Sequence, residues 1–282
     1  MTLRELIQRT ARQFRAAKLH FGHGTDNAHD EAAFLVLRGL GLSFDAELNQ
    51  EVDPSRVETL IARRIEQRIP AAYLLNEAWL DGQRFYVDRR VIVPRSHIAF
   101  LLKDLPIEPR RILDLCTGSG CLAILAARAF PEARVDASDI SAAALKVAAR
   151  NVRAHRLSGR IRLVRSDLFG ALKQRYDLIV SNPPYVGTPA MRRLPPEYRY
   201  EPGLALASGR QGLDHTGQIL AAVARYLRPG GLLVCEVGDG KRALERAYPH
   251  LGLRWPQPEV FILEASKTAA ASRTRPRRSR AT

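Results

Sequence analysis

The chain has 282 residues, of which 46% are hydrophobic, and its 44 basic and 29 acidic residues give a formal net charge of +15. This length suits one large α/β domain with a small second domain, because domains usually have ~100–200 residues. No stretch approaches the ~20 apolar residues that a membrane span needs, and the first residues lack a secretory signal, so we expect a cytoplasmic protein without a membrane partner.

Apolar residues recur at helical spacing between residues 2 and 69, which predicts a small helical domain over residues 1–77. Thr2 and Glu5 have the spacing of a capping box at the start of the first helix. A second apolar cluster lies around Phe34, and Asp53-Pro54 is a start signal for a third helix.

Short β-prone runs follow between residues 78 and 95, at Phe85-Tyr86-Val87 and Val91-Ile92-Val93. The dipeptide Asp81-Gly82 is typical of a tight turn between two strands. We therefore expect residues 78–95 to form a β-hairpin that links the helical domain to the rest of the chain.

Strand-like and helix-like segments alternate from residue 96 to residue 264. This alternation predicts a Rossmann-like α/β fold, a mostly parallel and doubly wound sheet with ligands at the carboxyl ends of its strands. The predicted strands are 111–115, 133–137, 161–164, 176–181, 232–237 and 260–263, and the predicted helices are 122–130, 142–155, 217–227 and 242–248.

Residues 265–282 carry six basic residues and no acidic one, so we expect a disordered tail that is either a solubilising extension or an RNA-touching arm. The rest of the chain still has 38 basic and 29 acidic residues, a net charge of 38 − 29 = +9. Such basicity is typical of a protein with a polyanionic partner. A composition of 38 arginines and six lysines also fits a biased genome.

Cysteine and histidine patterns give no sign of a metal site. Cys116, Cys121 and Cys235 contain no Cys-x-x-Cys pair, which excludes a disulfide framework and a zinc site of that type. The histidines between residues 20 and 29 lack acidic or thiol partners at ligand spacing, so we expect no metal.

A glycine-rich loop, Asp114-Leu115-Cys116-Thr117-Gly118-Ser119-Gly120, ends one predicted strand and opens a helix. Its glycines let a ligand approach the backbone N–H groups at the helix start. The pattern Gly118-x-Gly120-x-x-Ala123 also fits a dinucleotide site. However, an acid at the start of the loop suits a ligand with an ammonium and a sulfonium better than a pyrophosphate, which favours S-adenosylmethionine.

Acidic residues follow three successive predicted strands, at Asp114, Asp139 and Asp167. Asp139 is placed to accept hydrogen bonds from two ribose hydroxyls, and Asp167 with Leu168 to contact the adenine. The structural alternative is that these residues are caps or turn formers. The predicted cofactor-binding residues are Asp114, Cys116, Thr117, Gly118, Ser119, Gly120, Asp139, Ile140, Asp167, Leu168 and Asn182.

The strand-like run 176–181 leads directly into Asn182-Pro183-Pro184-Tyr185. Two prolines stop the strand and fix the corner. The Asn182 side-chain oxygen and the Pro183 carbonyl are two acceptors for both hydrogens of one NH₂ group, and the Tyr185 ring can stack on a flat group. The alternative is an incidental proline-rich turn. Asn182, Pro183 and Tyr185 are candidate catalytic residues, and together with Pro184 they are candidate substrate-binding residues.

An amide nitrogen is a poor nucleophile because its lone pair is delocalised, so an enzyme must hold it in line with the methyl group. Two acceptors do this without a strong base, and their dipoles also face the developing positive charge. The two motifs together therefore predict methyl transfer to a planar amide or amino nitrogen.

The Asn-Pro-Pro-Tyr motif resembles both the amino-group DNA methyltransferases and the protein glutamine methyltransferases. The stretch from Pro70 to Ser96 resembles the PrmB-type branch, whose members methylate a glutamine of large-subunit ribosomal protein three, and further similarity extends over most of residues 70–264. The resemblance implies a class I methyltransferase fold with a seven-stranded sheet in residues 96–264. It also implies S-adenosyl-L-methionine as cofactor, S-adenosyl-L-homocysteine as product, and the glutamine N5 nitrogen as acceptor.

The sister enzymes that methylate release factors typically carry Pro-Arg-Pro-Glu-Thr-Glu where this chain has Pro94-Arg95-Ser96-His97-Ile98-Ala99, which favours the ribosomal-protein branch. His97 and Phe100 depart from that branch, which usually has proline and glutamate there. The resemblance implies that Arg95 and the N-terminal helices shape a peptide channel and recognise the substrate. A release-factor enzyme, an adenine-amino DNA methyltransferase and a non-catalytic ribosome-binding module stay open as alternatives.

The charge of the chain bears on its partner. A ribosomal protein is itself strongly basic, so a free ribosomal protein and a chain of net charge +15 would repel each other. We therefore expect the ribosomal protein substrate to be recognised within an assembly intermediate that carries RNA.

Overall fold

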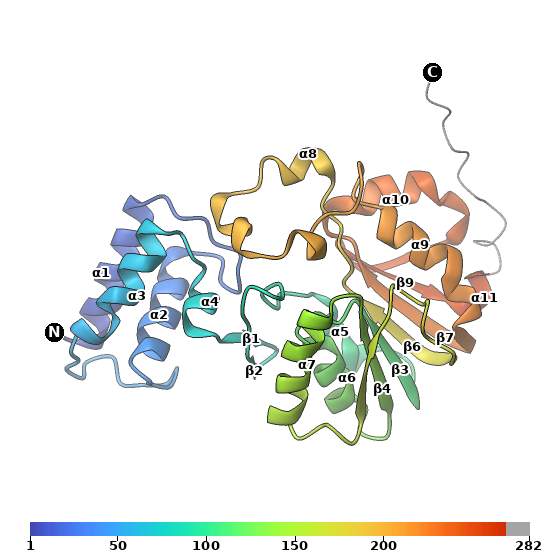
Figure 1. Ribbon diagram of the computed structural model, residues 1–282, viewed down its shortest axis with the longest axis horizontal. Coiled ribbons are helices and arrows are strands. Elements are labelled where there is room, and N and C mark those ends of the chain that lie inside the picture. The colour runs from blue at the N-terminus through green and yellow to red at the C-terminus, as the bar shows by residue number, and fades with distance from the viewer. Residues whose placement is uncertain (269–282) are drawn as a thin grey trace. The chain divides into compact units, whose positions relative to one another are not determined.

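The computed structural model describes residues 1–268 of the chain (Figure 1). These residues divide into two compact units. The first, here called the helical unit, consists of Met1–Arg95 and Leu194–Pro202, and the second, the sheet unit, consists of Ser96–Arg193 and the chain from Gly203 onward. Among the described residues, no helix combines the length and the hydropathy that a membrane crossing requires.

The helical unit contains four α-helices, α1 (Leu3–Ala16), α2 (Ala28–Gly39), α3 (Ser55–Glu66) and α4 (Ala71–Leu75). The predicted capping box is confirmed, since the Thr2 hydroxyl accepts from the Glu5 N–H and the Glu5 carboxylate accepts from the Thr2 N–H. Asp53 accepts from the N–H of Ser55 at the start of α3. Helix α1 buries Leu3, Leu6, Ile7 and Phe14 on one face, as its periodicity predicts.

A β-hairpin of β1 (Ala78–Leu80) and β2 (Gln83–Phe85) follows α4 within the helical unit. The predicted turn is confirmed, because Asp81 and Gly82 both have positive φ, 46° and 68°, as a two-residue hairpin loop of this kind requires. The strand predicted at residues 91–93 is wrong. The Val93 N–H donates to the Glu201 carboxylate at 3.0 Å and is not part of a strand ladder. That the hairpin links two domains stays a prediction.

The sheet unit is built on seven strands in the order β5-β4-β3-β6-β7-β9-β8, and the first five in this order are parallel to their neighbours. β9 is antiparallel to both β7 and β8. The predicted mostly parallel sheet is therefore confirmed. The strands are β3 (Arg111–Leu115), β4 (Arg134–Asp139), β5 (Ile161–Arg165), β6 (Tyr176–Ser181), β7 (Leu227–Glu236), β8 (Arg254–Gln257) and β9 (Val260–Glu264).

Helices flank this sheet, and Figure 1 shows α6 and α7 beside β3 and β4, with α9, α10 and α11 beside the β7 end. The α-helices are α5 (Ile98–Leu101), α6 (Cys121–Ala129), α7 (Ala142–Ala154), α8 (Thr188–Met191), α9 (Asp214–Ala222), α10 (Lys241–Ala247) and α11 (Ala265–Thr268). Single 3₁₀ turns lie at Leu102–Asp104, Pro196–Tyr200, Gly203–Ala205, Val223–Arg225, Gly238–Gly240 and Pro249–Leu251.

Several features of the sheet unit differ from expectation. The helix predicted at 217–227 is shorter, because α9 ends at Ala222 and strand β7 already begins at Leu227. Strand β8 was not indicated by pattern, because it is an edge strand of only four residues that contains Pro256. The predicted tail begins with helix α11, since Ala265 packs against the apolar core around β7 and β9. The rest of the predicted tail, residues 269–282, lies outside the described part of the chain.

The order of the strands fixes where a ligand can bind. The chain runs outward from β3 to β4 and β5, then returns to place β6 on the other side of β3. In an open parallel sheet, such a reversal of strand order leaves a crevice at the carboxyl ends of the two neighbouring strands. The loop after β3 and the corner after β6 therefore meet at this edge of the sheet.

Candidate active site at the carboxyl ends of the central strands

Asp114, near the end of β3, is fully buried and anchors the glycine-rich loop. One carboxylate oxygen accepts from the Thr117 hydroxyl and from the Ala123 N–H, the latter at 2.9 Å. The other oxygen, Oδ1, has no hydrogen-bond partner among the described residues. Burial raises the pKa of Asp114 to about 7, although the two hydrogen bonds lower it. An unsatisfied buried acceptor is costly, so Oδ1 marks a place where a donor or a cation would be stabilised.

The two glycines of the loop serve different purposes. Both have left-handed backbone conformations, with φ of 54° at Gly118 and 81° at Gly120. A Cβ at Gly118 would meet no atom within 4 Å, so a ligand has room there. A Cβ at Gly120 would lie 3.2 Å from the Ala148 Cβ, so this glycine lets the loop pack against α7. That a ligand also approaches its backbone stays a prediction.

Helix α7 contributes a residue that the sequence did not single out. The buried Asn151 side chain donates to the Ser119 carbonyl at 2.8 Å and so fixes the loop from the side. Cys116, in the same loop, has a positive φ of 64°, and burial raises the pKa of its thiol well above the usual value. The thiol therefore stays protonated and does not act as a nucleophile.

Asp139 ends β4 and ties the loop to the start of α7. Its carboxylate accepts from the Gly118 N–H at 2.9 Å and from the Ser141 N–H at 2.8 Å. A carboxylate has about four lone-pair positions, so two acceptor positions are left for a ligand. Burial raises the pKa of this group. The neighbouring Ile140 side chain is 44% exposed, an apolar surface beside the loop.

Asp167 and Leu168 follow β5, and Ser166 shapes this turn. The Ser166 hydroxyl donates to the Leu168 carbonyl at 2.6 Å and accepts from the Ala171 N–H at 3.0 Å, while Leu168 has a φ of 42°. The Ser166 N–H donates to the Asp139 carbonyl at 3.0 Å, which joins the ends of β4 and β5. Asp167 is exposed, and its contact with the adenine stays a prediction.

The corner after β6 begins with Ser181, whose hydroxyl donates to the Leu115 carbonyl at 2.8 Å and so fixes the end of β6 against the end of β3. Asn182 is half-buried, and Pro183 and Pro184 are buried. Within the described part of the chain, neither the Asn182 carboxamide nor the Pro183 carbonyl takes part in a hydrogen bond. The two acceptors that the sequence predicts are therefore available to an external NH₂ group.

Tyr185 is surrounded by two glycines that the sequence did not identify as site residues. A Cβ at Gly238 would lie 2.7 Å from Cε2 of the Tyr185 ring, and a Cβ at Gly212 would lie 2.2 Å from the Tyr185 carbonyl oxygen. Both glycines have positive φ, 49° and 77°. Only glycine fits both requirements, so Gly238 and Gly212 set the position of Tyr185.

The segment after Tyr185 is tied to residues 206–209 by backbone hydrogen bonds. The Val186 N–H donates to the Leu206 carbonyl at 2.8 Å, and the Ser208 N–H donates to the Val186 carbonyl at 2.9 Å. The Thr188 N–H then donates to the Gly209 carbonyl at 2.8 Å. These bonds hold the corner rigidly, which a group that positions a substrate requires.

Glu236, at the end of β7, is a further buried residue that the sequence did not single out. Its carboxylate accepts from the Ser96 hydroxyl at 2.6 Å and from the His97 N–H at 3.0 Å. Proline has no N–H, so His97 makes a contact that the usual proline of the branch would not make. Phe100, the second departure, is 54% exposed.

Arg95 belongs to the helical unit and has a strong partner there. Its guanidinium makes two contacts with the buried Glu201 carboxylate, at 2.5 and 2.7 Å. Such a bidentate pair fixes the residue geometrically. The structure therefore gives Arg95 a role in holding the 194–202 segment, and a direct contact with a peptide substrate stays a prediction.

The described residues contain no group of three or more histidine, cysteine or carboxylate side chains arranged to hold a metal ion. Cys116, Cys121 and Cys235 are all free thiols. The residues at this edge of the sheet offer carboxylate, amide and carbonyl acceptors, an aromatic ring and the open backbone at Gly118.

Comparison with known proteins agrees with this arrangement. Residues 97–193 match the methyltransferase small domain. The chain is 52% identical over 268 residues to the ribosomal protein uL3 glutamine methyltransferase of Bordetella pertussis, with 90% of each chain covered. It is 49% identical to the protein of the same name from Neisseria meningitidis, covering 93% of this chain and 92% of that one, and 45% identical to the one from Burkholderia pseudomallei, covering 96% and 97%.

Among solved structures, the catalytic domain of hMettl16 in complex with the MAT2A 3′UTR hairpin 6 is similar in fold, with a TM-score of 0.50 at 15% identity over 75% of this chain and 80% of that chain. The fold and the domain match confirm the predicted class I methyltransferase fold. Because relatives at 45–52% identity cover most of its length, the chain belongs to the family of ribosomal protein uL3 glutamine methyltransferases.

Proposed function

We propose that this protein transfers a methyl group from S-adenosyl-L-methionine to the side-chain N5 nitrogen of a glutamine in ribosomal protein uL3. The names of the relatives support the substrate. The observation that carries the reaction is the pair of free acceptors at Asn182 and Pro183, on a corner fixed to the end of β3 by Ser181.

The residues of the loop fit this cofactor. The cofactor supplies a methyl group on a positively charged sulfur, and its amino acid part carries an ammonium. Asp114 offers the buried, unpartnered Oδ1 to a positive or donor group, and Gly118 leaves open space beside the backbone. Asp139 retains acceptor positions for two ribose hydroxyls, and Ile140 exposes an apolar surface to the base.

Asn182 and Pro183 would hold the glutamine amide through its two N–H groups. This leaves one face of the planar nitrogen, where its lone pair lies, open to the methyl group, and the two acceptor dipoles stabilise the charge that develops on the nitrogen. Tyr185 would pack against the flat amide and restrict its rotation. No strong base is required, since the proton is lost readily once the nitrogen has become tetrahedral and cationic.

The substrate assignment is tested by incubating the protein with methyl-labelled cofactor and, separately, purified uL3, a release factor and duplex DNA. We expect label in uL3, in its free form or within an RNA-containing particle, and none in duplex DNA. Label in the release factor alone would refute the branch assignment, and label in DNA would revive the adenine-amino alternative. If no substrate is labelled but the protein still binds ribosomal particles, the alternative of a non-catalytic ribosome-binding module would be supported. Action on a ribosomal protein accords with the expected cytoplasmic location.

A further inference from the structure

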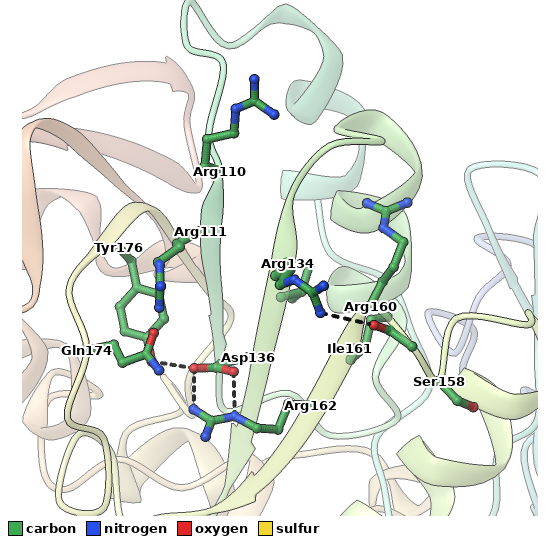
Figure 2. A pocket seen from close by; sticks show the side chains of 12 residues that line it. Arg110, Arg111, Arg134, Asp136, Ser158, Arg160, Ile161, Arg162, Gln174 and Tyr176 are labelled. Carbon is green, nitrogen blue, oxygen red and sulfur yellow. Dashed lines mark hydrogen bonds and ion pairs between the residues drawn. The ribbon is translucent and has the colours of Figure 1, made fainter.

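A second concave site lies at the other end of the same strands, opposite the carboxyl ends that carry the candidate active site (Figure 2). It is a groove of about 570 Å³ lined by residues at the amino ends of β3, β4, β5 and β6. Asp114, Asp139 and Ser181 lie at the carboxyl ends of these strands. Because a strand of five residues is ~16 Å long, a molecule in this groove would leave the methyl-transfer site open.

Five arginines line the groove, against a single acidic residue, Asp136. Arg162 forms a fork with Asp136, at 2.8 and 2.7 Å, which Figure 2 shows, and the Tyr176 hydroxyl donates to the same carboxylate at 2.8 Å. The Asp136 carboxylate thus accepts three hydrogen bonds, and its charge is balanced by Arg162. The other four arginines are Arg110, Arg111, Arg134 and Arg160.

These four guanidinium charges are not neutralised by strong ion pairs. Arg160 donates to the carbonyls of Phe130, at 2.7 Å, and Ala133, at 2.9 Å, which fix its position but leave its charge in place. Among the described residues, no carboxylate forms an ion pair with Arg111, Arg134 or Arg160.

The acids closest to the groove do not cancel this charge. Arg110 lies 3.3 Å from Glu132, but both side chains are more than 70% exposed, and such surface pairs contribute ~0–1 kcal/mol. Asp177 accepts the backbone N–H groups of Arg110 and Arg111, at 2.9 and 2.8 Å, and pairs with Arg228. The groove therefore presents a strongly positive surface.

We propose that this groove binds the sugar–phosphate backbone of RNA. Guanidinium groups recognise phosphates through paired N–H donors. The arginines lie at the starts of three neighbouring strands, β3, β4 and β5, which are ~4.8 Å apart. They therefore extend over ~10 Å, which suits successive phosphates of one chain better than a single phosphate group. That the RNA belongs to a particle carrying the substrate rests on the proposed function, since uL3 is a ribosomal protein.

The proposal is tested in the full chain with the double variant Arg111→Gln/Arg134→Gln. The matched control is Arg242→Gln/Arg246→Gln, which removes the same charge from exposed positions of α10. Binding of a labelled RNA hairpin is measured by fluorescence anisotropy between ~50 and ~200 mM salt. We expect the groove variant to bind about tenfold more weakly, with a salt dependence smaller by ~1.5 in the log–log slope, and the control to bind as the wild type does.

Equal loss of RNA affinity in the groove variant and the control would overturn the proposal, since the effect would then be one of net charge. The proposal also fails if RNA binding is lost only when Arg273 and Arg275 of the tail are replaced by glutamine, because the tail would then be the binding site. It fails as well if polyglutamate displaces the labelled hairpin as effectively as unlabelled RNA does, because the groove would then bind any polyanion. Methylation by the groove variant should stay at the wild-type level on isolated uL3 and fall on RNA-containing particles. If the wild type methylates neither isolated uL3 nor the RNA-containing particles, the proposed function fails. The comparison of RNA binding between the groove variant and the control still decides whether the groove binds RNA.

Discussion

The aromatic ring of Tyr185 occupies the space where a side chain on Gly238 would stand, since a Cβ there would lie only 2.7 Å from Cε2 of the ring. The two residues are more than fifty positions apart, on the corner after β6 and on the turn after β7. The absence of a side chain at Gly238 therefore sets the position of the Tyr185 ring, which we propose packs against the substrate amide at Asn182.

Replacing Gly238 by alanine should displace the Tyr185 ring and lower kcat for uL3 by ~10–100-fold, because small misplacements of positioning groups are costly in rate. Cofactor affinity should change little. Gly252→Ala is the matched control, since Gly252 also has a left-handed φ, 56°, but a Cβ there would meet no atom within 4 Å. Both variants bear a backbone strain of ~1–2 kcal/mol. An equal loss of kcat in both would mean that strain, and not the ring, is responsible.

Replacing Asn182 by alanine removes one of the two proposed acceptors for the substrate amide. We expect kcat to fall at least ~100-fold, as for the loss of a preorganised hydrogen-bonding group at other active sites. Asn182→Asp retains an acceptor oxygen and should therefore keep more activity than the alanine variant. Single-turnover methylation of uL3 would measure this order, with thermal melting as the control for folding. Alanine and aspartate variants of equal activity would argue against the acceptor role.

The elements of the sheet unit were predictable because their signal is local. Runs of buried apolar residues mark β3 and β6, and the predicted bounds 111–115 and 176–181 are those of the structure. The contacts that shape the site were not predictable, because they join residues distant in sequence. No local pattern shows that Gly120 faces Ala148 or that the Val93 N–H is taken by Glu201. Each of these depends on the packed structure.

The buried carboxyl of Asp114 should make stability depend on pH. Its pKa is raised from 3.8 to about 7 by burial, so the folded protein favours the protonated form. This contribution to stability is complete below pH ~4 and is lost as the pH rises through ~7. Asp114→Asn removes the ionisation, so the variant should gain stability relative to the wild type between these values, by ~4 kcal/mol at most. Urea unfolding at a series of pH values measures the difference, and a difference independent of pH would contradict the assignment.

A buried ion cluster in the helical unit holds the segment Leu194–Pro202. Arg64 is fully buried and contacts Glu31 through Nε and Glu197 through Nη1, the latter at 3.5 Å. Arg68 also pairs with Glu197, at 2.8 Å, and the His20 N–H donates to the same carboxylate oxygen at 2.9 Å. Burial alone would raise the pKa of Glu197. The hydrogen bond from His20 and the charges of the two arginines lower this pKa by more than burial raises it, so the carboxylate stays ionised. The charge of Arg64 is thus balanced by two carboxylates from separate segments.

Glu197→Gln should destabilise the protein by ~3 kcal/mol, because it removes one partner of a buried cluster and leaves cationic charge without compensation. Glu58→Gln is the matched control in the same unit: Glu58 is 59% exposed and lies 3.6 Å from Arg9, so its loss should cost less than ~1 kcal/mol. Urea unfolding gives both free energies. Trypsin gives a local readout, since the exposed Arg192 and Arg193 precede the segment and should be cut faster in the Glu197 variant. Equal unfolding energies and equal cleavage rates in the two variants would show that the segment is held by its apolar contacts and not by the buried charges.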